Sequence, residues 1–327
     1  MKRDVYLELR SELVELGFFR PNPLIGVTAL IVETLLFVTL CYTLTQVEQF
    51  SLEFWAIQVV LGVSMFRFFA LLHECGHRAM FSSRGLNTIW GVYASLFCFV
   101  PYVPWRNLHL LHHKWVGVID KDPTQVGLLK LKNSSKLKLN LFRVVWKLCI
   151  PIPSIQLIFS VFWLYPFKLF MQKEYSKAWG SFASVFACLV PHTAALAVFG
   201  LDNYVIYVLP MLFMFFLWFE IINFTHHSEL FPYTSETHPD PIPLHEQDAV
   251  SRTSAFSRII STIFAYNFNF HTEHHYFPTI PWHHLPKVYD MLKKLPANPN
   301  YNDVSFLGFS IHLRSKNPLD VYVKSLP

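Results

Sequence analysis

The sequence is poor in charged residues and in paired cysteines. Only 15% of its 327 residues are charged, whereas 53% are hydrophobic, which excludes an ordinary water-soluble domain with a solvated exterior. The five cysteines show no paired spacing, which argues against a disulfide framework or a zinc ribbon. The sequence also lacks an internal repeat, a low-complexity tract and a flexible linker, so we expect a single domain over residues 1–327.

Four apolar runs are each long enough to cross a bilayer, because about 20 apolar residues in a helix span its hydrocarbon core. They cover residues 24–46, 53–72, 181–200 and 203–222. The first run follows both acidic and basic residues and has no small-residue cleavage site, so we expect an uncleaved membrane helix. The sequence therefore predicts an all-α integral membrane protein with four transmembrane helices.

Prolines interrupt two further apolar stretches, at residues 88–104 and 150–171. If either stretch crossed the membrane alone, it would put the histidine clusters described below on opposite faces of the bilayer. We therefore expect both stretches to be interfacial or re-entrant.

Charge is distributed unevenly between the loops. Fourteen Lys and Arg residues lie between Arg78 and Lys177, whereas the turns at 46–53 and 200–203 carry acidic side chains and no basic ones. Because Lys and Arg favour cytoplasmic loops, we expect the long basic loop and both termini to be cytoplasmic. The two short turns would then lie outside.

Nine of the sixteen histidines have the spacing of metal ligands. Positions three or four apart share one face of a helix, so each cluster can direct its imidazoles toward one point. We expect the clusters to meet at the cytoplasmic ends of the crossings, in a helical cap. The predicted ligands are His73 and His77 in HECGH, His109, His112 and His113 in HLLHH, His227 in NFTHH, and His271, His274 and His275 in HTEHH, with His226 as a tenth candidate.

The number of imidazoles indicates two metal ions. Imidazole binds iron, zinc, copper and nickel, so the spacing alone does not identify the metal. A single catalytic zinc takes three protein ligands and a water, which would leave most of these histidines unused. Two irons would use them all, and they can together reduce oxygen, which zinc cannot do.

Two other classes of protein remain open. HECGH also fits the HExxH pattern of zinc proteases, in which Glu74 would be the general base, but a protease would leave the other clusters unexplained. A histidine-rich metal transporter should hold its ligands near the bilayer midplane, whereas these clusters lie at helix ends and in loops. Steady oxygen uptake that depends on a lipid would exclude the transporter.

The order of the clusters resembles that of the membrane fatty acid desaturase and hydroxylase family, whose boxes have the forms HxxxH, HxxHH and HxxHH. The strings HLLHHKWVGVIDKDP and NFNFHTEHHYFPTIPWHHLP are similar to its second and third boxes, and the resemblance covers residues 50–290. It implies two iron ions, oxygen as co-substrate and a lipid or fatty acyl substrate. Because the sequence has no His-Pro-Gly-Gly haem motif, electrons must come from a separate protein.

The resemblance extends to one further pair of residues. In stearoyl-coenzyme A desaturases an asparagine precedes an additional histidine ligand by four positions, and Asn223 and His227 have this spacing. By this resemblance His227 is the ninth ligand and Asn223 holds an iron-bound water. The first box differs, because three residues separate His73 from His77 where those enzymes have four, so the iron that each one binds is not assigned.

Carboxylates are expected around the imidazoles, because they orient the rings and offset the charge of the ions. Glu220 is the strongest candidate, since it lies one turn before Asn223 in an apolar run where an unpaired carboxylate is costly. Arg67 is expected to pair with such a carboxylate. The other candidates are Glu74, Glu273, Asp120 and Asp122.

The favoured function is oxygen-dependent desaturation of a fatty acyl chain. Hydroxylation, carotenoid ketolation or hydroxylation, and decarboxylation to a terminal alkene would use the same site, and the histidine pattern does not choose among them. The basic loop suits docking of an acidic electron carrier of the ferredoxin or cytochrome b5 type, or contact with anionic membrane lipids. No nucleic-acid partner is expected.

Overall fold

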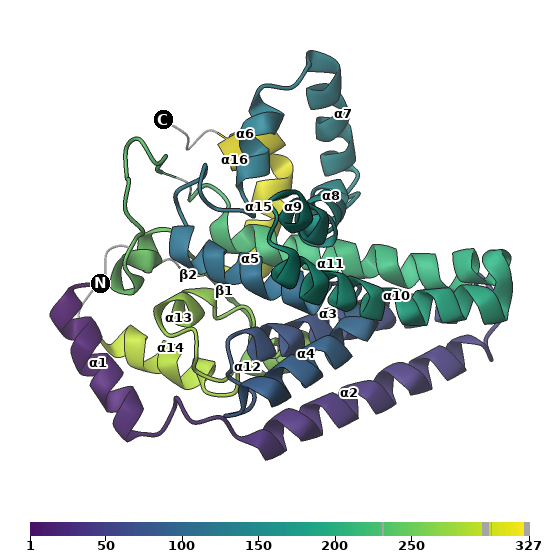
Figure 1. The fold of residues 1–327 in the computed structure, drawn as a ribbon, viewed down its shortest axis with the longest axis horizontal. Helices are drawn as coiled ribbons and strands as arrows, with labels where there is room; N and C mark the ends of the chain where they lie inside the picture. The colour runs from purple at the N-terminus through teal and green to yellow at the C-terminus, as the bar shows by residue number, and fades with distance from the viewer. Residues whose placement is uncertain (231, 296–300, 302, 324–327) are drawn as a thin grey trace.

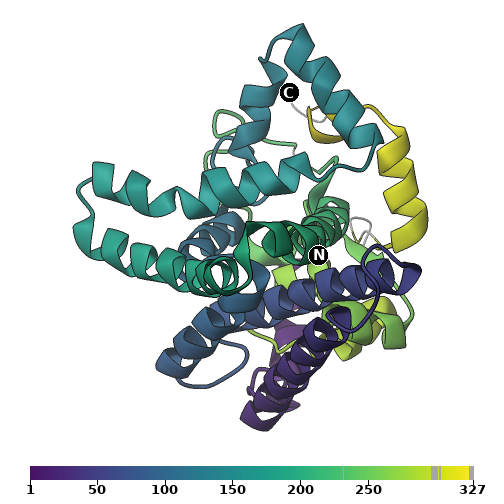
Figure 2. The same ribbon diagram turned by 90° about the vertical axis from the view of Figure 1, so that its right-hand side faces the viewer.

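The computed structural model describes residues 1–230, 232–295, 301 and 303–323. It is 71% helical with almost no sheet, which confirms the predicted all-α class. Figure 1 shows long helices that extend to one end of the molecule and shorter helices that form a cap at the other end. Figure 2, from the side of the long helices, shows the cap helices arranged around them.

The long helices are α2 (Pro23–Leu44), α3 (Leu52–Gly76), α10 (Tyr175–Asn203) and α11 (Leu209–His227), with the π-helical turn η2 (Tyr204–Val208) before α11. The segments between α3 and α10 are α4 (Arg84–Cys98), α5 (Tyr102–Trp115), α6 (Val126–Lys132), α7 (Lys136–Lys147), α8 (Ile152–Leu157), η1 (Ile158–Trp163) and α9 (Tyr165–Met171). The remaining elements are α1 (Arg3–Glu15), η3 (Leu244–Ala249), β1 (Thr253–Ala255), α12 (Arg258–Ala265), α13 (His271–Tyr276), α14 (Leu285–Lys294), β2 (Asp303–Ser305), α15 (Phe306–Ser315) and α16 (Pro318–Val323).

Among the described residues, four helical stretches are long and apolar enough to cross a membrane: Pro23–Leu44, Leu52–Gly76, Ile152–Met171 and Tyr175–His227. The last stretch is 53 residues long and consists of two helices, because the backbone turns at Gly200, whose φ is 78°. Glycine adopts this conformation without strain. The four expected crossings match three of these stretches, except that α2 ends at Leu44, two residues before the expected end at 46.

The helix ends differ from the expected ends of the crossings. Helix α3 was expected to stop near residue 72 and α11 near 222, but they continue to Gly76 and His227. Helical hydrogen bonding does not end where the apolar run ends, since polar residues near the cap are equally able to form it. As a consequence His73 and His227 lie on rigid helices.

The two stretches expected at the interface differ from each other. Helices α4 and α5 are bent by 104° at their junction, where Phe99 has a left-handed φ of 56°, so residues 88–104 do not form one straight crossing. Residues 152–171 form a nearly continuous helix that is itself long and apolar enough to cross. Figure 1 shows its last part, α9, almost end on while α2 extends along the molecule; its interfacial position remains a prediction.

Close packing of α3 against its neighbours requires two glycines. A Cβ at Gly62 would lie 2.4 Å from Met214 Cβ on α11, and a Cβ at Gly76 would lie 2.5 Å from the Trp105 ring on α5. Small residues permit helices in membranes to approach closely. At Gly62 and Gly76, α3 therefore packs closely against α11 and α5. Helix α3 carries the first histidine box, α5 carries the second box, and α11 carries His227.

A polar network joins α2 and α3 to the segment before the third box. The Glu33 carboxylate is fully buried and lies 2.8 Å from Arg67 Nε, so Arg67 pairs with a carboxylate that is not among the candidates expected around the imidazoles. Ser64 donates a hydrogen bond to Glu33. Arg67 donates a hydrogen bond of 2.9 Å to the Tyr266 hydroxyl, which in turn donates to Glu33 over 3.2 Å. The network thus connects three segments that are far apart in the sequence.

A short parallel pairing closes the cap. Strand β1 pairs with β2, with Thr253 opposite Asp303 and Ala255 opposite Ser305. Thr253 also donates a hydrogen bond to Glu273 in the third histidine box. The pairing therefore links the segment that leads into α15 to a strand that contacts the third histidine box.

Candidate metal centre

All nine predicted ligand histidines lie in two buried groups, each with its ligand atoms within 4.8 Å of one another. The first group has five members and the second has four. The first contains His73, His77, His109, His113 and His274, and the second contains His112, His227, His271 and His275.

Helices α5 and α13 each contribute to both groups. In α5, His109 and His113 belong to the first group and His112 belongs to the second; in α13, His271 and His275 belong to the second group and His274 to the first. Residues four apart project from the same face of a helix, and the residue between them projects to the neighbouring face. The HxxHH spacing therefore allows each of these two helices to supply ligands to both groups.

The imidazole nitrogens lie at distances that suit a shared ion. Adjacent nitrogens would be about 3.0 Å apart around an octahedral ion and about 3.4 Å apart around a tetrahedral one, for metal–nitrogen bonds of about 2.1 Å. The observed distances between Nε2 atoms are closer to the octahedral value. They are 2.8 Å for His77–His109, 3.1 Å for His109–His113, 3.0 Å for His113–His274, 2.8 Å for His227–His271 and 3.1 Å for His271–His275.

Hydrogen bonds at Nδ1, the ring nitrogen that does not face the other imidazoles, fix the orientation of three rings in the second group. His112 Nδ1 lies 2.7 Å from Asp122, His227 Nδ1 lies 2.9 Å from the Val250 carbonyl, and His275 Nδ1 lies 2.8 Å from Gln247 Oε1. These partners accept, so each Nδ1 carries the proton and each neutral ring keeps a bare Nε2.

The protein's own hydrogens cannot satisfy all the bare nitrogens of the second group. His271 Nε2 lies between His227 Nε2 and His275 Nε2, and its single N–H can satisfy only one of them. Burial of unpaired acceptors so close together is costly. A metal cation would bind all of them, so the donor set fits a metal ion.

Burial also keeps the rings of the third box in the form that binds metal. Desolvation, followed by the charge of neighbouring imidazoles, lowers the pKa of His271, His274 and His275 well below the usual histidine value. The neutral imidazole is the form that binds metal. These three rings are therefore ready to bind an ion at physiological pH.

Two of the five candidate carboxylates contact or approach a ligand imidazole. Asp122 is bonded to His112 and also accepts hydrogen bonds from Thr124 N and Oγ1, at 2.9 Å and 2.7 Å. Burial alone would raise the pKa of Asp122, but the His112 imidazole and the Thr124 hydrogen bonds lower it below its usual value. Glu74 Oε1 is 3.5 Å from His73 Nδ1, and its other oxygen accepts a hydrogen bond of 2.8 Å from Trp282 N.

The structure pairs the other three carboxylates elsewhere. Glu220 accepts from Arg314 and from Ser154 N, Glu273 from Thr253 and Tyr301, and Asp120 from Ser235. Burial raises the pKa of Glu273 to about 7. These contacts, among the described residues, assign Glu220, Glu273 and Asp120 to holding segments of the fold together, in place of the expected contact with ligand rings.

His226 and Asn223 lie beside the metal centre. The His226 ring stacks on the His271 ring, with centroids 4.0 Å apart and planes 12° apart, and it belongs to neither group. Asn223 donates a hydrogen bond of 2.8 Å to the Phe219 carbonyl and lines a cavity with His227. Its role in holding a bound water remains a prediction.

Two supporting residues were not identified from the sequence. Gln247, in η3, accepts from His275 and donates to the His113 carbonyl, so it links the two groups. Arg252 donates to the Thr225 and Ser228 carbonyls at the end of α11, where a cation also interacts favourably with the helix dipole. Each is a single polar residue in a segment without a recurring pattern, so the sequence carries no signal for either.

An apolar cavity of about 80 Å³ adjoins both groups. On one side it is bounded by His109 of the first group and by His112, His227 and His271 of the second. Its other walls are mainly the side chains of Phe69, Trp105, Leu157, Phe162, Phe219 and Phe268. An apolar group in this cavity would lie against imidazoles of both groups and away from water.

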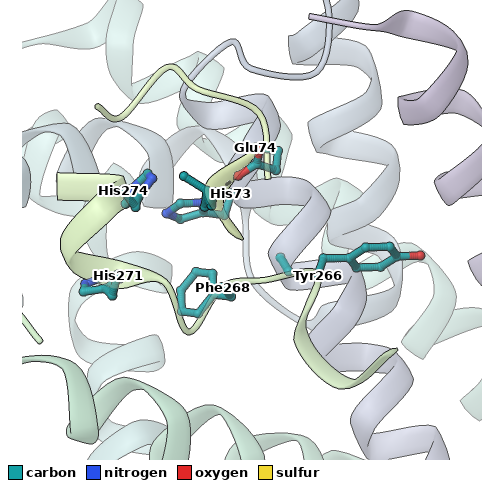
Figure 3. A pocket seen from close by; sticks show the side chains of 8 residues that line it. His73, Glu74, Tyr266, Phe268, His271 and His274 are labelled. Atoms are coloured by element: carbon teal, nitrogen blue, oxygen red, sulfur yellow. Dashed lines mark ion pairs between the residues drawn. The ribbon is translucent and has the colours of Figure 1, made fainter. Parts of the chain in front are cut away.

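A second, smaller cavity shares Phe268 and His271 with the first. It measures about 10 Å³, room for about one water molecule. Figure 3 shows the rings of His73, His271 and His274 on one side of this space and Tyr266 on the other, with Phe268 between them. Phe268 and His271 line both this small space and the larger cavity.

Replacing Asp122 with asparagine is expected to weaken metal binding about 10- to 100-fold, because removal of such a partner to a ligand histidine has an effect of this size. Asparagine keeps the side-chain volume but removes the charge that holds the His112 proton on Nδ1. Competition with a chelator would measure the affinity for ferrous iron. Asp120→Asn is the matched control, since Asp120 bonds to Ser235; equal losses in the two variants would contradict the assignment.

Most of this chain is similar in sequence to known proteins. The fatty acid desaturase family model matches residues 51–305. A probable fatty acid desaturase of Sorghum bicolor is 26% identical over 71% of this chain and 60% of its own length. An omega-3 fatty acid desaturase of Caenorhabditis elegans is 24% identical over 78% of this chain and 65% of its own length.

A bacterial relative gives a similar result. The sn-1 acyl-lipid omega-3 desaturase (ferredoxin) of Synechocystis is 24% identical over 74% of this chain and 67% of its own length. The matches span 60% to 67% of the length of these relatives, and the family-model match includes every histidine of both groups. This chain belongs to the fatty acid desaturase family of membrane oxidoreductases.

Proposed function

We propose that this protein desaturates a fatty acyl chain with oxygen, using two iron ions held by the two histidine groups. The observation that carries the proposal is the apolar cavity, whose walls include imidazoles of both groups and the rings of Phe69, Trp105 and Phe219. A methylene inside this cavity would be within reach of both ions. Its volume of about 80 Å³ is below the about 300 Å³ of a small-molecule pocket, so it would hold only part of a chain.

The irons, when bound, would supply the reduction of oxygen and the removal of hydrogen from an unactivated carbon. The protein's residues would position the chain and exclude water. Phe69, Phe219 and Phe268 would hold the methylenes against the metal side of the cavity. Asp122 and Gln247 would keep the ligand rings in the orientation that the ions require.

The substrate and electron donor are proposed by similarity. Relatives are named as Delta(12) and omega-3 fatty acid desaturases, and one name specifies an acyl-lipid substrate and ferredoxin. We therefore propose a fatty acyl lipid as substrate and a small one-electron protein as donor. The basic loop between Arg78 and Lys177 suggests that this donor, the metal centre and both termini are on the cytoplasmic side.

Expression in a host that lacks the activity is expected to yield fatty acids two hydrogens lighter than their precursors, since desaturation removes two hydrogens and adds no oxygen. Mass spectrometry of total lipids would detect them and locate the double bond. His112→Ala is the control, because it removes a ligand of the second group. Products heavier by one oxygen would favour the hydroxylase, and a shorter terminal alkene would favour the decarboxylase; either result would overturn desaturation while leaving the metal centre in place.

A further inference from the structure

Helix α7 has an exposed apolar stripe that the proposed function does not use. Leu137, Leu141, Val144 and Leu148 are 80%, 61%, 54% and 65% exposed. They are spaced by four, three and four positions, so they lie on one face of the helix. The opposite face is occupied within the protein, where Trp146 is fully buried and packs with Phe224 and Leu313.

Basic side chains flank the stripe. Residues 126–148 contain six Lys or Arg residues and no Asp or Glu. At 100° per residue, Lys138 projects on one side of the stripe, and Lys136 and Lys147 project on the other. Among the described residues, no carboxylate forms an ion pair with Lys136 or Lys138. Four of the six, Lys130, Lys132, Lys136 and Lys138, are exposed.

The stripe adjoins an apolar helix in the sequence. Only residues 149–151 separate Leu148 from the apolar helix that begins at Ile152, and these span at most about 14 Å. That helix also exposes apolar side chains, including Leu164 and Phe167, both 55% exposed. Figure 1 shows α7 running crosswise to α2 and the other long helices, which is the orientation of a helix lying in the plane of a membrane surface.

We propose that α7 is an interfacial helix that lies in the headgroup layer of an anionic phospholipid membrane. Its leucines and Val144 would enter the acyl boundary, and Lys136 and Lys138 would contact headgroup phosphates. An acidic electron carrier would match the lysines but would leave the apolar stripe facing water or a polar surface. The membrane matches both features, so the chemistry favours lipid over a protein partner.

Hydrogen exchange of the full chain in lipid nanodiscs tests this proposal. Amides of α7 are expected to exchange more slowly in discs containing one third phosphatidylglycerol than in pure phosphatidylcholine. Each lysine near an anionic surface strengthens binding to that surface about fivefold. The double variant Lys136→Gln with Lys138→Gln should therefore reduce the protection of the α7 amides by up to about thirtyfold. Leu141→Gln with Val144→Gln should speed exchange in both kinds of disc.

The matched control is Lys2→Gln with Lys294→Gln, which removes the same charge from exposed lysines outside α7. It should leave the exchange of α7 unchanged. Amides of α3 serve as an internal reference for folding in every variant. Exchange of α7 that is independent of lipid charge, or that slows only when an acidic ferredoxin is added, would overturn the proposal. Because exchange is measured without turnover, the result does not depend on desaturase activity.

Discussion

The His227→Ala variant is expected to contain fewer than two irons per chain and to form no detectable product. His227 Nε2 lies 2.8 Å from His271 Nε2, and its Nδ1 is held by the Val250 carbonyl, so the ring has no other partner for its bare nitrogen. The second group would retain three of its four imidazoles. Iron content by elemental analysis and unsaturated product by mass spectrometry would measure both effects.

The neighbouring residue provides the control. His226 is fully buried, lies in neither ligand group and stacks on His271. His226→Phe keeps an aromatic ring in the stack and removes both nitrogens, so it is expected to retain two irons. Loss of iron from His226→Phe that equals the loss from His227→Ala would show that His226 is a ligand and that the two groups are wrongly assigned.

The histidines that the structure brings together are those singled out from the sequence. Each of the three boxes contains histidines three or four residues apart, and helical geometry alone brings such residues to one or two adjacent faces. The structure brings all nine together. It also divides them between two groups by a rule that follows from the same geometry, since i and i+4 share a group in both α5 and α13. The sequence could not predict which faces would be opposed, because that depends on how α3, α5 and α11 pack.

Partners of buried polar residues were much harder to predict. Glu220 was expected near the metal because an unpaired carboxylate is costly in an apolar run. The Glu220 carboxylate is indeed paired in the structure. Its partner is Arg314, which is 94 residues away in the sequence, and nothing local identifies it. For the same reason Arg67 could be expected to pair with a carboxylate, but Glu33 could not be named as that carboxylate.

Removing one member of the Glu33–Arg67 pair is expected to destabilise the protein by about 3–5 kcal/mol, because it leaves an uncompensated buried charge. Glu33 is fully buried, and Arg67 is 14% exposed. For Glu33→Ala, this corresponds to a fall in the midpoint of thermal unfolding on the order of 5–15 °C. Unfolding followed by circular dichroism in one detergent would measure the change.

Replacing both Glu33 and Arg67 distinguishes the effect of an unpaired buried charge from the effect of lost packing. Glu33→Leu with Arg67→Met removes both charges at similar volume, and such replacements are often neutral or stabilising. The double variant should therefore be more stable than Glu33→Ala. It would still lose the Arg67 hydrogen bond to Tyr266, and Tyr266 precedes the third histidine box by five residues. A double variant that regains stability but binds iron more weakly would show that the network positions α13; one that remains as unstable as Glu33→Ala would contradict the buried-charge argument.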